Sequence, residues 1–426
     1  MESRPTRVRH IVLWLTVLAY MITYMDRVVI STAAPAIQEE FGFSTITMGW
    51  IFFAFQISYA LFQIPGGWLG DRYGPRKALT LVVTWWSAFT ALSAAAWSAG
   101  SMIVIRFLFG MGEAGAFPIA TRSLSRWMLP SERGWAQGVT HAGARLGAAL
   151  TPVLVAFLIL HFGWRAPFFI FALVGLVWAA AWFLYYRDTP REHGSVNEGE
   201  LEKIESALGT RSAVRKSVPW KQLLSNPQIW LLSAMYFCYG YSIVTFLAWF
   251  PKYLDDARGL ELAEMGLYAS VPLAAGVLGD LAGGWFSDGL LKRSGNLKMA
   301  RRLVAVAGFL IAGVMVPLAA LAGDPLVSIG FFALAVFGLE LTVGVSWAVT
   351  LDVGGEYAGS VSAVMNTFGN TAGALTSVAT GYLVTHVGWT SAFYAVAGFA
   401  LMGAVLFLWL DASRRLYVEP VQPQGD

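Results

Sequence analysis

Six ionisable side chains interrupt long apolar stretches in the first half of this sequence. A stretch of about 20 apolar residues is long enough to cross a membrane, and a charge at the centre of a bilayer costs at least about 2.5 kcal/mol. Hydrophobic side chains would build the same helices without that cost, so we predict that these charges bind or carry other charges. The six are Asp26, Arg27, Arg106, Glu113, His141 and Arg145.

The spacing of these residues places them in groups. The first two are adjacent, about two-thirds along the first apolar stretch. Arg106 and Glu113 are seven residues apart, which puts them on one helix face about 10 Å apart along the axis. His141 and Arg145 are four residues apart and share a face. Carboxylates can bind protons, and the arginines beside them can bind anions in alternation. These groups therefore predict a site for protons and an anion.

Purely structural ion pairs, Asp26 with Arg27 and Arg106 with Glu113, are the alternative interpretation. A buried ion pair is weak evidence of stabilisation, because desolvation can cancel the attraction. We therefore favour the functional interpretation for these pairs.

The second half of the chain has fewer intramembrane charges. Glu340 lies near the middle of its apolar stretch, and Asp280 lies near the end of another. We expect Asp280 to support the loop at Asp288, and the roles of Glu340 and Asp280 stay open at this point.

The composition is that of an all-α membrane protein. Of the 426 residues 57% are hydrophobic and 13% charged, against about 25% charged in soluble proteins. A single cysteine, Cys238, excludes an internal disulfide. Charges at residues 26 and 27 interrupt the first stretch, so we predict a retained helix rather than a cleaved signal peptide. We count about twelve membrane helices, which begin near Ile11, Ile46, Lys77, Ser101, Gly134, Arg165, Pro227, Glu264, Arg301, Pro325, Tyr357 and Trp389.

The chain repeats itself across one polar segment. The sequence His-Phe-Gly-Trp at 161–164 matches His-Val-Gly-Trp at 386–389, and Gly-Gly-Trp at 66–68 matches the same triplet at 283–285. We therefore predict two parallel repeats of six helices, residues 1–187 and 225–426, joined by a linker at 188–224. Within the linker, 200–208 is amphipathic, and we expect its charges to form a solvated face.

A glycine-rich loop with an acid and several basic residues lies between the second and third stretches. It resembles the signature loop of the major facilitator superfamily, which has twelve helices in two parallel six-helix repeats. Its basic residues, with most others of the chain, fall on one side of the membrane when both termini are cytosolic. The resemblance implies a multi-pass protein of the bacterial inner membrane. The loop residues in question are Gly67, Asp71, Arg72, Gly74 and Arg76.

Further motifs are similar to those of the anion:cation symporter branch of that superfamily. They lie at 24–27, 56–59, 63–67, 106–110, 113–115 and 366–370. This branch includes bacterial transporters of galactonate, glucarate and hexuronates, and the animal vesicular glutamate and sialic-acid transporters. The resemblance covers nearly the whole chain except the linker.

The resemblance implies a role for each matching residue. Asp26 and Glu113 match the two acids that such symporters protonate. Arg27 matches the arginine that contacts the substrate carboxylate, and Arg106 matches the one that couples the acids to the anion. Three more positions match residues that line the central cavity: Tyr59, Trp347 and Asn366.

One position departs from the sugar-acid members of the branch. They carry a glutamine on the fifth helix where this chain has Ala144, followed by Arg145. An amide suited to hydroxyl groups is absent and a cation stands nearby, so we expect His141 and Arg145 to line the cavity. This favours a dicarboxylate or another compact organic acid over a sugar acid.

We therefore predict proton-coupled symport of an organic carboxylate, with protons as coupling ion and no cofactor or metal. An organic-anion exchanger without proton coupling is the alternative, and a membrane sensor or enzyme is more remote. The sequence has neither a Gly-x-x-x-x-Gly-Lys nucleotide loop nor a His-Glu-x-x-His metal motif. We expect a monomer whose partners are a small organic acid and the lipid bilayer, and no nucleic acid.

Overall fold

The structure is a computed structural model that describes residues 5–129, 132–208 and 220–414. All regular elements in these ranges are helices. Polar residues begin several of them: Asn226, Asn296 and Asp324 each accept a hydrogen bond from a backbone N–H in the first turn of the helix that follows. These caps satisfy donors that a helix cannot satisfy internally.

The first half supplies six membrane crossings. Helix α2 is divided into two helices at Gly74, whose φ is 78°. Residues with a side chain rarely adopt this conformation, so glycine suits the break. Helices α3 and α4 follow each other with two intervening residues and together form one span of 29 residues. The helices of this half are α1 (Val8–Phe41), α2 (Thr45–Ala94), α3 (Ala99–Glu113), α4 (Ala116–Trp127), α5 (Arg133–Phe162) and α6 (Ala166–Tyr185).

The second half supplies six more crossings. Ten helical spans in the described residues are long and apolar enough to cross a membrane; α2 covers two crossings, and α14, with 29 residues, adds the twelfth. The predicted twelve-helix fold is therefore confirmed. The helices of this half are α9 (Pro227–Ala248), α10 (Phe250–Asp256), α11 (Leu262–Ser294), α12 (Leu297–Leu321), α13 (Pro325–Gly354), α14 (Ala358–His386) and α15 (Trp389–Trp409).

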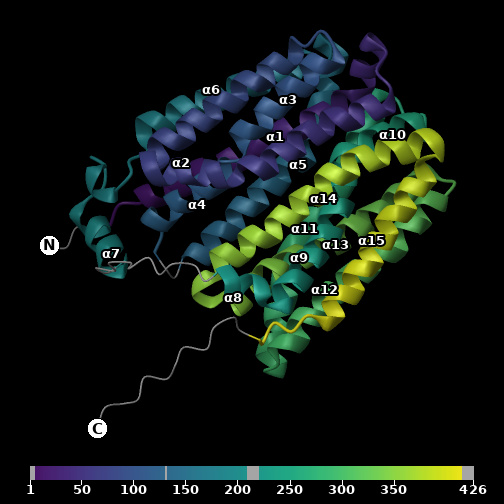
Figure 1. The fold of residues 1–426 in the computed structure, drawn as a ribbon. Helices are drawn as coiled ribbons and strands as arrows, with labels where there is room; N and C mark the ends of the chain where they lie inside the picture. The colour runs from purple at the N-terminus through teal and green to yellow at the C-terminus, as the bar shows by residue number, and fades with distance from the viewer. Residues whose placement is uncertain (1–4, 130–131, 209–219, 415–426) are drawn as a thin grey trace.

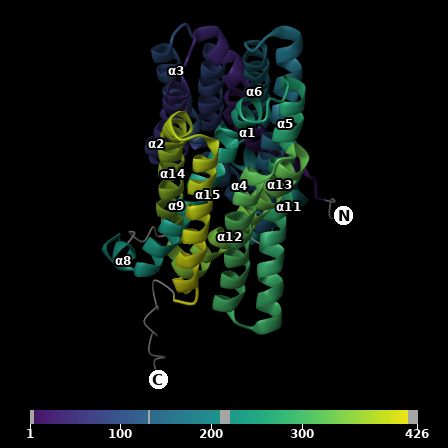
Figure 2. The same cartoon turned by 90° about the vertical axis from the view of Figure 1, so that its right-hand side faces the viewer.

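The helices of both halves run roughly parallel in one bundle (Figures 1 and 2). In Figure 1 the first half is purple to teal and the second is green to yellow, with α7, α8, the start of α1 and the end of α15 at one end of the bundle. We call this end the linker side and the opposite end, where α10 lies, the distal side.

The two halves pack against each other at the distal side. A Cβ atom added at Gly49 of α2 would lie 2.7 Å from the Ser377 carbonyl oxygen of α14, and one added at Gly266 of α11 would lie 2.8 Å from the Pro152 carbonyl oxygen of α5. Buried Trp249 meets Phe52 edge-on, with ring centroids 5.1 Å apart.

At the linker side, two glycines of the same helices have no close neighbour. A Cβ atom added at Gly138 of α5 or at Gly359 of α14 would meet no described atom within 4 Å. The tight contacts between the halves described above thus lie at the distal side.

The signature loop is a compact ionic cluster at the linker side. The Asp188 carboxylate accepts a hydrogen bond from the Arg76 backbone N–H (3.1 Å), and a Cβ atom at Gly74 would lie 2.5 Å from it. Asp71 forms an ion pair with Arg122 of α4. Sequence analysis placed Asp188 in the linker, yet its carboxylate joins the loop to the end of α6.

The other residues of the signature loop pack nearby, and the second half has a related cluster. Gly67 packs on Pro118 of α4, and Arg72 lies 5.8 Å from the Trp68 ring centroid. In the repeated segment, Arg301 pairs with Asp288 (2.8 Å) and with Asp352 (2.9 Å).

The linker contains η1 (Pro190–Glu192), α7 (Glu198–Leu208) and α8 (Trp220–Ser225). A helix over the amphipathic run is confirmed, but a fully solvated charged face is wrong. Exposed Glu205 pairs with Arg191, whose guanidinium holds the pKa of that carboxyl below its usual value. Glu200 on the same helix is fully buried.

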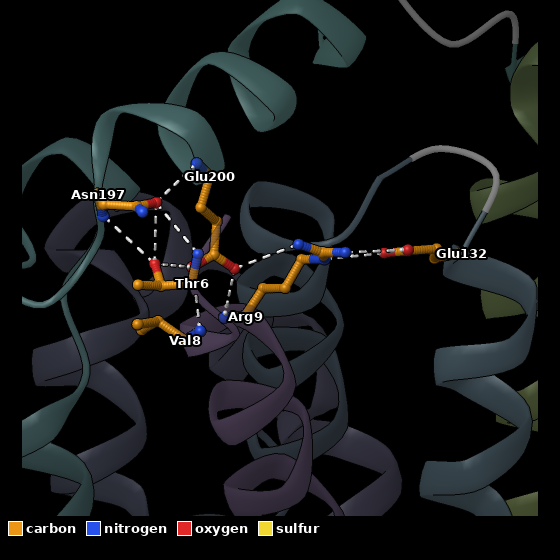
Figure 3. A network of polar contacts seen from close by, with 6 residues as sticks. All are labelled: Thr6, Val8, Arg9, Glu132, Asn197 and Glu200. Carbon is orange, nitrogen blue, oxygen red and sulfur yellow. Dashed lines mark hydrogen bonds and ion pairs between the residues drawn. The ribbon is translucent and has the colours of Figure 1, made fainter. Parts of the chain in front are cut away.

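Glu200 joins the linker helix to the start of α1 (Figure 3). Its carboxylate accepts hydrogen bonds from the backbone N–H groups of Val8 (3.1 Å) and Arg9 (3.2 Å) and pairs with the Arg9 guanidinium (3.2 Å). Arg9 also pairs with Glu132 at the start of α5 (3.2 Å). An acid at a helix N-terminus accepts hydrogen bonds from the free N–H groups of the helix and interacts favourably with the helix dipole. Glu200 of α7 therefore caps α1.

Candidate functional site

One buried ion pair lies within the first half. The Arg27 guanidinium of α1 donates through Nε to Oε1 of Glu113, the last residue of α3. The Arg27 side chain is 15% exposed and that of Glu113 is fully buried. The structure thus pairs Arg27 with an acid from another helix, rather than Asp26 with Arg27 or Arg106 with Glu113 as the structural alternative expected.

Asp26 and Arg106 surround this pair with unsatisfied polar atoms. Trp86 Nε1 donates to Asp26 Oδ2 (3.1 Å). Within the described residues, Asp26 Oδ1, Glu113 Oε2, and Nε and Nη1 of Arg106 have no hydrogen-bond partner. Arg106 is 1% exposed and interacts electrostatically with both acids.

Buried polar atoms without partners are costly. A carboxylic acid that holds a proton loses its charge, and the proton can satisfy a neighbouring oxygen. The arrangement of Asp26, Arg106 and Glu113 is therefore suited to taking up and releasing protons, because protonation relieves a cost that the deprotonated cluster carries.

Aromatic rings enclose the Arg27 guanidinium. Its Cζ lies 4.4 Å from the ring centroid of Tyr59, 4.9 Å from that of Tyr24 and 5.5 Å from that of Phe117. Aromatic faces attract a cation and leave few competing hydrogen-bond acceptors. An arginine held in this way can be reached by an anion that replaces its carboxylate partner.

A second buried ion pair joins the two halves. Arg145 Nη2 of α5 lies 2.9 Å from Glu340 Oε2 of α13, with side chains 12% and 2% exposed. The Tyr239 hydroxyl of α9 accepts a hydrogen bond from Arg145 (3.1 Å) and donates one to Glu340 Oε1 (3.0 Å). Arg145 Cζ also lies 5.6 Å from the Tyr24 ring centroid, so Tyr24 stands beside both arginines.

His141 and Trp347 continue this surface across the bundle. The His141 ring centroid lies 6.3 Å from that of Phe117 and 6.1 Å from that of Trp347. Trp347 Nε1 donates to the Tyr236 hydroxyl (3.2 Å). Aromatic contacts thus connect the Arg27 pair in one half to residues of the other half.

Asp280 and Asn366 have neighbours other than those expected from the sequence. Asp280 interacts electrostatically with His141 and Glu340, whereas Asp288 pairs with Arg301, so the expectation that Asp280 supports that loop is wrong. Asn366 Nδ2 donates to Gln63 Oε1 across the halves (3.1 Å). It therefore lies on the α2–α14 contact rather than in the aromatic surface.

Sequence analysis missed Tyr24, Trp86, Tyr236 and Tyr239 as site residues. All are aromatic, and a chain with 18 tryptophans and 15 tyrosines offers no signal to separate these from packing residues. In the described part of the chain, no group of three or more His, Cys, Asp or Glu side chains could hold a metal ion.

Comparison with known proteins decides the family. Residues 16–377 match the family model described as the Major Facilitator Superfamily. The chain belongs to this superfamily. As a member it is a multi-pass membrane transporter and not an enzyme.

Similar superfamily members are described as transporters of organic anions. The chain is 40% identical to a probable sulfoacetate transporter of Cupriavidus necator, over 95% of this chain and 94% of that protein. It is 33% identical to a hexuronate transporter of Bacillus subtilis, over 96% and 94% respectively.

Solved structures show the same fold. A bacterial homologue of the lysosomal transporter Spinster, in an inward-facing and occupied conformation, matches with a TM-score of 0.76 and 19% identity, over 95% of this chain and 97% of that one. A D-xylose-proton symporter matches with a TM-score of 0.74 and 14% identity, over 94% and 97%.

Proposed function

We propose that this protein takes up a small organic anion together with protons, by alternating access of one central site to the two sides of the membrane. The observation that carries the proposal is the buried cluster of Asp26, Arg27, Arg106 and Glu113, in which an arginine holds an acid and further polar atoms have no hydrogen-bond partner among the described residues. Protons and an anion are the ligands that such a cluster can exchange.

Coupling follows from competition for Arg27. An anion that binds its guanidinium displaces Glu113, and the released carboxylate then binds a proton more firmly, because it has lost its cationic neighbour. Asp26, with Trp86 on one oxygen and none of the described residues on the other, is the second proton site. The loaded cluster is less charged, which lowers the cost of carrying it through an occluded state.

Proton coupling also solves the problem of membrane potential. An anion that enters against a negative-inside potential works against about 2.3 kcal/mol per charge per 100 mV. If the anion enters with more protons than it has negative charges, the membrane potential favours entry instead of opposing it. We also propose that both termini and the linker lie in the cytoplasm of a bacterial cell, the sidedness that the positive-inside rule predicts from the basic residues of the sequence.

A compact anion is the proposed substrate class. The relative described as a probable sulfoacetate transporter shares 40% of aligned residues, and its named substrate carries both a carboxylate and a sulfonate. The site adds Arg145 to Arg27, and the Tyr24 ring lies beside both guanidinium groups. We therefore propose sulfonated carboxylates and short dicarboxylates ahead of polyhydroxy sugar acids.

Proteoliposomes test this function directly. An inward proton gradient imposed on vesicles containing purified protein should raise the internal concentration of labelled sulfoacetate or malonate above the external concentration. A thermal-shift screen of organic acids would first identify the best ligand, because ligand binding raises apparent stability. Uptake that ignores the pH gradient and requires internal anion would identify an exchanger instead.

A further inference from the structure

The Arg145–Glu340 pair is an unusual feature for a protein whose halves must move. It is buried, it lies across the two halves, and the Tyr239 hydroxyl bridges both partners. Removing one partner of a buried ion pair is strongly destabilising, because the other charge is left uncompensated. Any rearrangement that separates α5 from α13 therefore needs a substitute anion for Arg145.

Arg145 has donors to spare for such an anion. In the described structure both polar contacts of its guanidinium start from Nη2, and a guanidinium carries five N–H groups in a planar fork suited to carboxylates and similar anions. Its side chain is 12% exposed, whereas that of Glu340 is 2% exposed. A ligand thus has access to the arginine from the side that Glu340 leaves free.

Arg27 is close to this position. The Tyr24 ring stands beside both guanidinium groups, 4.9 Å from Arg27 Cζ and 5.6 Å from Arg145 Cζ. Each arginine is held by an internal carboxylate, Glu113 for one and Glu340 for the other. Two arginines flanking one ring, each with an exchangeable acid, match a compact ligand with two anionic groups.

We propose that Glu340 occupies on Arg145 the place of the second anionic group of the substrate, and that this exchange makes the transporter select compact dianions over monoanions. The inference rests on the proposed function, which assigns the first anionic group to Arg27. Glu340 is thus a specificity-determining residue: it stabilises Arg145 when the site is empty and yields to a carboxylate or sulfonate that bridges both arginines. Ligands with a single anionic group leave the Arg145–Glu340 pair intact.

Calorimetric binding to the purified full-length protein tests the exchange. The probes are sulfoacetate, malonate and succinate as dianions, and acetate and methanesulfonate as monoanions carrying one group each. The variants are Arg145→Gln and Glu340→Gln, with Glu264→Gln, an exposed acid on α11, as the matched control. Thermal unfolding of each variant confirms that it is folded.

We expect Arg145→Gln to lower the affinity for at least one dianion tenfold or more and to change the affinity for monoanions less than threefold. Glu340→Gln should raise dianion affinity, because the competing carboxylate is lost, and Glu264→Gln should change nothing. The proposal is overturned if no dianion binds the parent, or if Arg145→Gln leaves the dianion-to-monoanion ratio unchanged.

A structural lock would give a different result. In that case Glu340→Gln would lower or leave equal the affinities for both classes of anion, which also overturns the proposal. Neither outcome touches the proposed function, since proton-driven accumulation of whichever anion binds is measured separately in proteoliposomes. Loss of that accumulation in the parent would overturn the function itself.

Discussion

Two buried ion pairs in this protein use the same chemistry and differ in what they connect. Arg27 and Glu113 belong to one half, so the pair can persist while the halves move as bodies. Arg145 and Glu340 belong to different halves, so their distance depends on the relative position of the halves. Beside the first pair, Asp26 Oδ1 and two Arg106 nitrogen atoms have no hydrogen-bond partner among the described residues, whereas the Tyr239 hydroxyl contacts both members of the second pair. We therefore propose that proton coupling belongs to the first pair and the selection of dianions to the second.

The largest expected effect separates the two acids. Glu113→Gln should abolish proton-driven accumulation, because the amide imitates the protonated acid and cannot release its proton, while counterflow of labelled substrate is retained in part. A pH gradient of one unit is worth about tenfold accumulation per coupled proton, and this factor should disappear. Asp26→Asn should behave similarly.

Glu340→Gln is the matched comparison, since it removes the acid of the other pair. It should still accumulate substrate when the proton gradient is imposed. Full accumulation by Glu113→Gln and Asp26→Asn, measured as internal label at steady state, would show that those acids are structural and that the pairs do not divide the work as described.

The second effect concerns the arginines. Arg27→Gln should weaken binding of monoanions and dianions alike, by about 1.5–3 kcal/mol for the loss of a charged hydrogen bond, or about tenfold to a hundredfold. Arg145→Gln should affect dianions alone. Calorimetric titration of both variants with acetate and malonate checks this, and equal selectivity in the two variants would erase the distinction.

A third, smaller effect comes from the contact between the halves. Gly49→Ala places a Cβ atom against the Ser377 carbonyl oxygen and should oppose distal closure by about 1–3 kcal/mol, as overpacking does elsewhere. It should raise dianion affinity, because separation of the halves draws the competing Glu340 carboxylate away from Arg145, and leave monoanion binding on Arg27 nearly intact. Gly359→Ala, which faces open space, is the control. Identical titrations of the two variants would speak against this dependence.

The smallest effect tests the bridge. Tyr239→Phe removes the hydroxyl that contacts both Arg145 and Glu340, and a hydrogen bond of this kind contributes about 1 kcal/mol, or about fivefold in affinity. We expect a shift of this size for malonate and none for acetate. Tyr241→Phe, also buried on α9, should leave both titrations unchanged. A change confined to acetate would be inconsistent with the bridge.

Much of the fold could be predicted from the sequence, because membrane helices are recognised by their length and hydropathy. Two features of the structure could not be predicted in this way. The segment predicted as a loop between the second and third stretches is helical apart from Gly74, and the linker acid Glu200 is buried although its amphipathic helix suggested a solvated face. Both depend on contacts with distant segments, which local pattern does not contain.

The candidate site was predictable in its residues and not in its pairings. Charges inside apolar stretches identified Asp26, Arg27, Arg106, Glu113 and Arg145. Their partners come from elsewhere in the chain: Glu113 lies 86 residues from Arg27, and the Tyr239 that contacts Arg145 lies 94 residues away. Neither spacing nor helical periodicity relates such positions, so the division between a pair within one half and a pair across the halves needed the structure.

One measurement tests the central claim most directly: proton entry that accompanies substrate entry. Proteoliposomes containing a trapped pH indicator receive external sulfoacetate or malonate, whichever binds the parent, with no pH gradient imposed. The account predicts internal acidification with the parent and with Glu340→Gln, and none with Glu113→Gln although labelled substrate still equilibrates by counterflow. Acidification of equal size with Glu113→Gln, or substrate entry by the parent without any acidification, would contradict it.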